Sequence, residues 1–223
     1  MRMGSTLVIA CGALARELRE LQRLNGWRHV EVEYLPAELH NTPSEIAPAV
    51  RARIEAARGR HSSIFVAYAD CGTGGRLDAL LAGLGVERLP GAHCYEFYAG
   101  GEAFRELHEA EPGTFYLTDF LVRNFEPLVI RGLGLDRHPE LHPAYFGNYR
   151  RLVYLAQSKS PELEKKARAC AARLGLEYDY RFTGLEHLER GLHPVKPAAG
   201  PAPSQRPAGG RAARAAGAPP ARR

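Results

Sequence analysis

The stretch SSIFVAYADCGTGGRLDALLAGL, residues 62–84, decides the fold. Its first part, residues 62–69, is an apolar run typical of a buried strand, and the glycine-rich turn Asp70–Gly75 ends it. The leucines that follow recur at helical spacing, at Leu77, Leu80, Leu81 and Leu84. A strand that turns through glycines into an amphipathic helix is the repeating unit of parallel sheets, so the sequence predicts an α/β fold.

The same rhythm continues on both sides of this stretch. We expect further strands at 6–10, 29–35, 86–90, 114–120, 151–157 and 177–182, with helices between most of them. The prediction is therefore a mainly parallel sheet of about six or seven strands with helices on both faces, a Rossmann-like three-layer arrangement in one domain over residues 1–194. In such sheets ligands bind beyond the carboxyl ends of the strands.

Two helix starts carry local signals. Thr42 is placed to be an N-cap, with Pro43 at the first helical position and Glu45 as the acid of a capping box. Ser160 and Pro161 mark a second helix start in the same way.

Composition excludes several classes of protein. Of the 223 residues, 45% are hydrophobic and 25% charged, values that fit a globular chain and neither a disordered nor a membrane protein. No apolar run is long enough for a transmembrane helix, and the N-terminus lacks the pattern of a signal peptide. We therefore expect a cytoplasmic protein without a membrane partner.

The positive charge of the chain is concentrated at its C-terminus. Residues 195–223 contain one Lys, five Arg and no acid; subtracting these six charges from the net +5 leaves −1 for residues 1–194. A nearly neutral body argues against a specific nucleic-acid partner. The last segment is rich in Ala, Pro, Gly and Arg and is predicted to be a disordered basic tail.

Three of the four cysteines follow strands at equivalent places. Cys11 comes after the first strand, Cys71 after the third and Cys94 just past the fourth. In a parallel sheet their thiols share one edge, where soft sulfur ligands suit Zn²⁺ or an iron–sulfur cluster. His93 or His40 would be the fourth ligand or the proton carrier. The alternative is that each cysteine is simply packed in the core, as is common for this residue.

The cysteines also indicate the redox state of the cellular compartment and one residue of the hydrophobic core. The absence of a CxxC pair and of a secretory signal indicates a reducing compartment. Cys170 shares one helical face with Leu163, Ala167 and Leu174, so we predict that this fourth thiol belongs to the core.

The turn that contains Gly72, Thr73, Gly74 and Gly75 admits a second interpretation. Glycines between a strand and a helix let backbone N–H groups approach an anion or a nucleotide, so this turn is a candidate cofactor-binding loop. Its D-x-G-x-G pattern resembles the glycine-rich loop of S-adenosylmethionine-dependent methyltransferases. The competing interpretation is a tight turn whose backbone geometry requires glycine.

Two polar residues follow later strands. Asp119 and Gln157 are expected to face the same crevice, Asp119 as a general base or a residue that orients a histidine, and Gln157 as a cofactor-binding residue beside His40. With His93, Asp119 completes the candidate catalytic set. An acid in such a loop is also commonly a helix N-cap.

The order of the segments VIACGAL, LPAELHNTP, VAYADCGTGG, LPGAHCYEFYAGG, PGTFYLTDF and YFGNYRRLVYLAQ resembles the DUF1638 family over about residues 5–192. The resemblance is carried by Cys11-Gly12, Leu39-His40-Asn41, Cys71-Gly72 and His93-Cys94. The resemblance brings with it an association of some relatives with corrinoid-dependent methyl-transfer systems in methane-producing archaea. The resemblance therefore implies thiol–metal or methyl chemistry and a corrinoid or methyltransferase protein as partner.

Three functional hypotheses follow. The first is a metal- or iron–sulfur-binding protein, a metal-dependent transferase or lyase, that holds its metal with Cys11, Cys71 and Cys94 and acts on a small-molecule substrate. The second is a transferase that binds S-adenosylmethionine or a nucleotide at the glycine turn. The third is a non-enzymatic carrier or assembly partner for a metal or cofactor.

Overall fold

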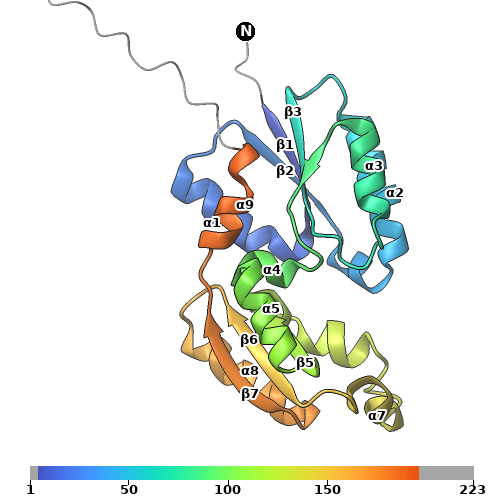
Figure 1. Ribbon diagram of the computed structural model, residues 1–223, viewed down its shortest axis with the longest axis vertical. Helices are drawn as coiled ribbons and strands as arrows, with labels where there is room; N and C mark the ends of the chain where they lie inside the picture. The colour runs from blue at the N-terminus through green and yellow to red at the C-terminus, as the bar shows by residue number, and fades with distance from the viewer. Residues whose placement is uncertain (1–4, 196–223) are drawn as a thin grey trace, which may run out of the picture.

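The computed structural model describes residues 5–195, which form two parallel sheets with helices packed against them (Figure 1). The first sheet has the order β2-β1-β3-β4 and the second the order β5-β6-β7. Every neighbouring pair of strands is parallel, which confirms the predicted α/β class. The strands are β1 Thr6–Cys11, β2 Val30–Leu35, β3 Ser63–Ala67, β4 Glu87–Arg88, β5 Thr114–Thr118, β6 Arg151–Ala156 and β7 Glu177–Phe182.

The prediction of one sheet with six or seven strands is wrong, because the seven strands divide four and three. The break falls after β4, which pairs with β3 through only two residues, Glu87 and Arg88. The strand that follows, β5, pairs with β6 and starts the second sheet. Periodicity locates strands along the chain but does not show which of them pair, because pairing depends on residues distant in sequence.

The helices begin and end as follows: α1 Ala15–Asn25, α2 Ile46–Ala57, α3 Arg76–Leu84, α4 Cys94–Ala99, α5 Gly101–Ala110, α6 Asp119–Arg123, α7 His142–Phe146, α8 Pro161–Leu174 and α9 Glu186–Gly191. Ser160 caps α8 as expected, since its Oγ accepts a hydrogen bond from the Leu163 amide at 3.3 Å. The cap expected at Thr42 is not made: its side chain bonds no helix amide, and a 3₁₀ turn at Pro43–Glu45 precedes α2.

Each sheet has its own hydrophobic core, and the end of the chain joins the first one. After β7 the chain returns to the first sheet, where Leu188 of α9 and Leu192 are fully buried (Figure 1). The His29 ring makes a hydrogen bond of 3.0 Å to the Val195 carbonyl, which fixes this return beside the start of β2. The two halves of the described chain are therefore linked by more than one crossing of the backbone.

Two further expectations concern membrane-spanning helices and the C-terminal tail. Within residues 5–195, no helix is both long and apolar enough to cross a membrane. The tail predicted for residues 195–223 lies outside the described residues, apart from Val195, which is buried in the first core.

Cys170 lies in the second core on α8, as predicted from its helical spacing. Replacing its thiol by a hydroxyl buries a more polar group among apolar neighbours. We expect Cys170→Ser to lower the free energy of unfolding by about 1–3 kcal/mol. Chemical denaturation measures this loss, and Cys170→Ala, which adds no hydroxyl, is the comparison. Equal stability of Cys170→Ser and the unmodified protein would contradict this placement.

Candidate functional site

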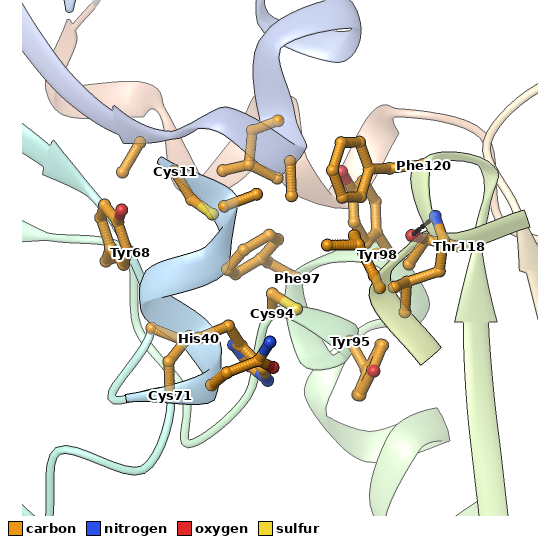
Figure 2. Close-up of a pocket in the computed structure, with 18 of the residues that line it drawn as sticks. Cys11, His40, Tyr68, Cys71, Cys94, Tyr95, Phe97, Tyr98, Thr118 and Phe120 are labelled. Atoms are coloured by element: carbon orange, nitrogen blue, oxygen red, sulfur yellow. Dashed lines mark hydrogen bonds between the residues drawn. The ribbon is translucent and has the colours of Figure 1, made fainter. Parts of the chain in front are cut away.

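A pocket of about 240 Å³ lies between the two sheets (Figure 2). One side is formed by the ends of β1 and β3 and the segments that follow β1, β2 and β3, and the other by α4, by β5 and by residues of the segment that follows β5. It therefore lies beyond the carboxyl ends of β1 and β3, where the strand order reverses, as expected for parallel sheets. Most lining residues are apolar or aromatic; the aromatic ones are Tyr68, Tyr95, Phe97, Tyr98, Phe115 and Phe120.

The pocket wall brings together the three cysteines that follow strands. Cys11 is the last residue of β1, Cys71 lies in the turn after β3, and Cys94 is the first residue of α4. His40, from the segment after β2, lines the same pocket on its open side. Residues that are 83 positions apart in sequence, Cys11 and Cys94, thus share one cavity, whereas Cys170 belongs to the distant second core.

The backbone at Cys71 is unusual. Its φ of +49° makes it the one non-glycine residue with positive φ among residues 5–195. Such a conformation costs about 1–3 kcal/mol and persists only where neighbouring contacts hold it. Here the Cys71 amide donates to the Ala92 carbonyl at 2.9 Å, and the Asp70 amide donates to the Gly91 carbonyl at 3.1 Å. These bonds hold the turn after β3 against the loop that precedes Cys94.

The protonation of Cys71 is set by its two neighbours in the pocket. The pKa of its thiol lies well below the ordinary value because the Cys94 thiol hydrogen-bonds to the sulfur, while burial acts in the opposite direction. The His40 imidazole adds a second hydrogen bond and a favourable charge, and the same contact raises the pKa of His40. The contact therefore favours the ionised form of Cys71 and the protonated form of His40.

The other two thiols of the pocket are held in the protonated form. The pKa of Cys94 is raised well above its ordinary value by its hydrogen bond to Cys71 and by burial. Burial also raises the pKa of Cys11, to about 11. The Tyr68 ring lies beside Cys11 (Figure 2), and its hydroxyl is buried without a hydrogen-bond partner at normal distance. The pocket thus contains one activated sulfur and one unpartnered phenol.

Residues 72–75 of the glycine turn do not line the pocket, and the amides of Thr73, Gly74 and Gly75 are already bonded. The carboxylate of Asp70 accepts hydrogen bonds from the Gly74 amide at 3.1 Å and the Gly75 amide at 2.9 Å, and also from the Thr73 hydroxyl. An internal carboxylate thus occupies the place that a phosphate takes in a phosphate-binding loop. This arrangement favours the tight-turn interpretation of residues 72–75.

Asp119 and Gln157 lie together, but in a buried network behind the pocket wall. Asp119 Oδ1 accepts hydrogen bonds from the Tyr154 hydroxyl at 2.6 Å and the Gln157 amide at 3.1 Å, and Oδ2 accepts one from the Ser158 hydroxyl. The Gln157 side chain in turn accepts from the Asp119 amide at 2.8 Å. These bonds join the ends of β5 and β6, and neither residue is part of the pocket lining.

His93 is exposed and lies outside the pocket lining. Its amide donates to Glu96 Oε1 at 3.3 Å at the start of α4, so its backbone helps to begin the helix that carries Cys94. Of the two histidines considered beside the thiols, the structure therefore places His40, and not His93, against Cys71.

The predicted metal ligands share the pocket without forming a coordination sphere. Across the described part of the chain, no group of three or more His, Cys, Asp or Glu side chains is arranged so that it could hold a metal ion. Sequence reasoning also missed the aromatic lining, above all Tyr68 and Tyr98, since a buried tyrosine in an apolar run gives no signal that it faces a cavity.

Comparison with known proteins gives one family. The model of the family described as "Protein of unknown function (DUF1638)" matches residues 34–192. The match starts after the first strand, whereas the resemblance seen in the sequence begins at about residue 5. None of the curated proteins compared with the chain matches it.

The lowered pKa of Cys71 makes its reactivity nearly independent of pH above neutrality. We expect iodoacetamide to alkylate Cys71 at similar rates at about pH 7 and about pH 9, because its thiol is ionised at both. The reaction should slow only in acid, where the thiolate becomes protonated. Cys11, with its pKa raised to about 11, should instead react faster as the pH rises. Peptide mass mapping of timed reactions resolves the two sites. A Cys71 rate that climbs in parallel with that of Cys11 would contradict the assignment.

Removing the imidazole should weaken the thiolate. We expect His40→Ala to raise the pKa of Cys71 and to slow its alkylation in acid, at about pH 4, by about tenfold for each pKa unit of that rise, while the rate at neutral pH changes little because the thiolate still predominates there. His93→Ala is the matched control, because His93 lies outside the pocket. If His93→Ala slows the reaction and His40→Ala does not, the roles of the two histidines are reversed.

Proposed function

The chain belongs to the DUF1638 family, and we propose that it binds a small, mainly apolar molecule between its two sheets and acts on it with the Cys71 thiolate. The observation that carries the proposal is that Cys71, held with a positive φ, lines one apolar pocket together with Cys94 and His40. The lowered pKa of the Cys71 thiol agrees with this arrangement. Thiolates are the nucleophilic form of cysteine, and an adjacent histidine is a common means of activating one.

The size and lining of the pocket support a small substrate. Its volume of about 240 Å³ is below the range usual for drug-sized ligands. Aromatic rings and alanines supply most of the contact surface, and charged groups are few. A substrate there would bury apolar surface while one electrophilic atom approaches Cys71. The strained backbone at Cys71 supports the same proposal, because such strain is concentrated at functional sites.

Blocking the pocket tests whether binding precedes reaction. Ala13 lines the cavity, and a phenyl group at this position should fill much of it. We expect Ala13→Phe to slow modification of Cys71 by phenylmaleimide by about tenfold, equivalent to about 1.4 kcal/mol of lost binding. The rate with the much smaller iodoacetamide should change less. Ala82→Phe, at an exposed position of α3, is the control for adding a phenyl group.

Two results would contradict the proposal. In one, Ala13→Phe and Ala82→Phe leave the phenylmaleimide rate equally unchanged, so that the pocket contributes nothing. In the other, phenylmaleimide modifies Cys170 or Cys11 of the unmodified protein before Cys71.

A metal centre stays a second proposal. It is supported by the three thiols and His40 that line the same pocket, a donor set suited to Zn²⁺ or an iron–sulfur cluster. Cys11, Cys71, Cys94 and His40 would have to move closer together to form it. Analysis of anaerobically purified protein for zinc, iron and labile sulfide tests this proposal. The carrier role and the corrinoid or methyltransferase partner depend on the same result.

Binding of S-adenosylmethionine or a nucleotide at residues 72–75 is the weakest proposal, because Asp70 already occupies the amides that would hold such a ligand. Calorimetric titration with S-adenosylmethionine tests it.

A further inference from the structure

Cys71 and Cys94 are held side by side by the loops that carry them. Besides the two backbone bonds between residues 70–71 and 91–92, the Arg88 guanidinium donates to the Leu89 carbonyl at 2.6 Å and the Gly91 carbonyl at 3.2 Å. The Glu96 carboxylate accepts from the Ala92 amide at 2.9 Å. The loop before Cys94 is thus fixed at both of its ends, which holds Cys94 in the pocket that Cys71 also lines.

The four cysteines of the chain are all free, so the pair is present as two separate sulfurs. Cys11 lies on the Tyr68 side of the pocket (Figure 2), and Cys170 is in the other core. Among these thiols, Cys94 is the one whose loop is joined by backbone hydrogen bonds to the turn that carries Cys71.

We propose that Cys71 and Cys94 form a dithiol pair that reduces a small organic disulfide bound in the pocket between the two sheets. The inference rests on the proposed function, since it uses the same pocket and the same attacking sulfur. It adds the substrate class and a second reacting residue.

The reaction proceeds in two balanced steps. The Cys71 thiolate attacks one sulfur of the bound R–S–S–R; the S–S bond breaks, and the departing R–S⁻ takes a proton from the His40 imidazolium. Cys94 then attacks the Cys71 sulfur of the mixed disulfide, and the second R–S⁻ leaves with the Cys94 proton. One disulfide is reduced to two thiols, while Cys71 and Cys94 are oxidised to an internal disulfide. A small thiol or dithiol from solution returns the pair to its reduced form.

The geometry favours the second step. The backbone bonds from the amides of Asp70 and Cys71 to the carbonyls of Gly91 and Ala92 tie together the two loops that carry the thiols. After the first step the mixed disulfide on Cys71 therefore meets the Cys94 thiol within the same pocket, without a second molecule having to diffuse in.

The pocket favours a small apolar disulfide over a protein disulfide. The space of about 240 Å³ is enclosed by residues of both sheets, so a folded chain does not fit. The aromatic side chains that line this space, among them Tyr95, Phe97 and Phe120, suit an apolar substituent on the disulfide.

Dithiodipyridine, a small aromatic disulfide that releases coloured thiopyridone, tests the pair. Full-length reduced protein is mixed with one equivalent of the reagent and analysed by absorbance, intact mass and peptide mapping. We expect two thiopyridones per reagent molecule, no retained adduct and a Cys71–Cys94 disulfide. Cys94→Ser should release one thiopyridone and retain a pyridyl adduct on Cys71. Cys170→Ala, remote from the pocket, should behave like the unmodified protein, and circular dichroism checks that each variant is folded.

The outcomes separate this inference from the proposed function. If the unmodified protein itself retains the adduct on Cys71, or joins Cys71 to Cys11, the dithiol pair is refuted while the reactive Cys71 thiolate stands. If the reagent instead reacts first with Cys11 or Cys170 and leaves Cys71 free, both proposals fall. Because both of these outcomes are measured on the unmodified protein, a folding defect in Cys94→Ser leaves the test intact.

Discussion

The candidate site depends on the backbone hydrogen bonds that join the turn after β3 to the loop before α4. The amides of Asp70 and Cys71 donate to the carbonyls of Gly91 and Ala92, and this contact joins the two segments whose sulfurs, 23 residues apart in sequence, line one cavity. Gly91 is required there: its φ is +103°, and a Cβ would lie 2.9 Å from the Glu96 carboxylate that fixes the loop. Sheet pairing positions the strands, and these few bonds position the loops that carry Cys71 and Cys94.

Burial by itself would make every thiol in the pocket inert. It raises the pKa of Cys11 and Cys94, and it acts in the same direction on Cys71. The pKa of Cys71 is nevertheless lowered, because the Cys94 thiol and the His40 imidazole interact with its sulfur. Hydrogen bonds to a charged group are strong in apolar surroundings. The same cavity therefore favours the ionised form of Cys71 and the protonated forms of Cys11 and Cys94. This difference comes from the polar groups beside each sulfur and not from how deeply each is buried.

Much of the fold could be predicted from the sequence, whereas the site could be predicted only in outline. All seven strands follow from apolar periodicity, and the meeting of Cys11, Cys71 and Cys94 follows from the equivalent edge positions of parallel strands. The division into two sheets did not, because the strand β4 is short and pairing is a long-range property. Nor could the sequence show that Asp119 faces Tyr154 inside a closed network, or that Asp70 bonds the glycine turn, since both depend on side-chain direction.

The central claim is that the fold polarises one pair of thiols, with Cys71 ionised and Cys94 protonated. The most direct measurement is the pH titration of the Cβ carbon resonances of isotope-labelled cysteines by NMR in the intact chain, assigned with single Cys→Ser variants. We predict that Cys71 gives a thiolate resonance at neutral pH while Cys11, Cys94 and Cys170 remain thiols. Titration of Cys71 in the alkaline range together with the other three would contradict the account.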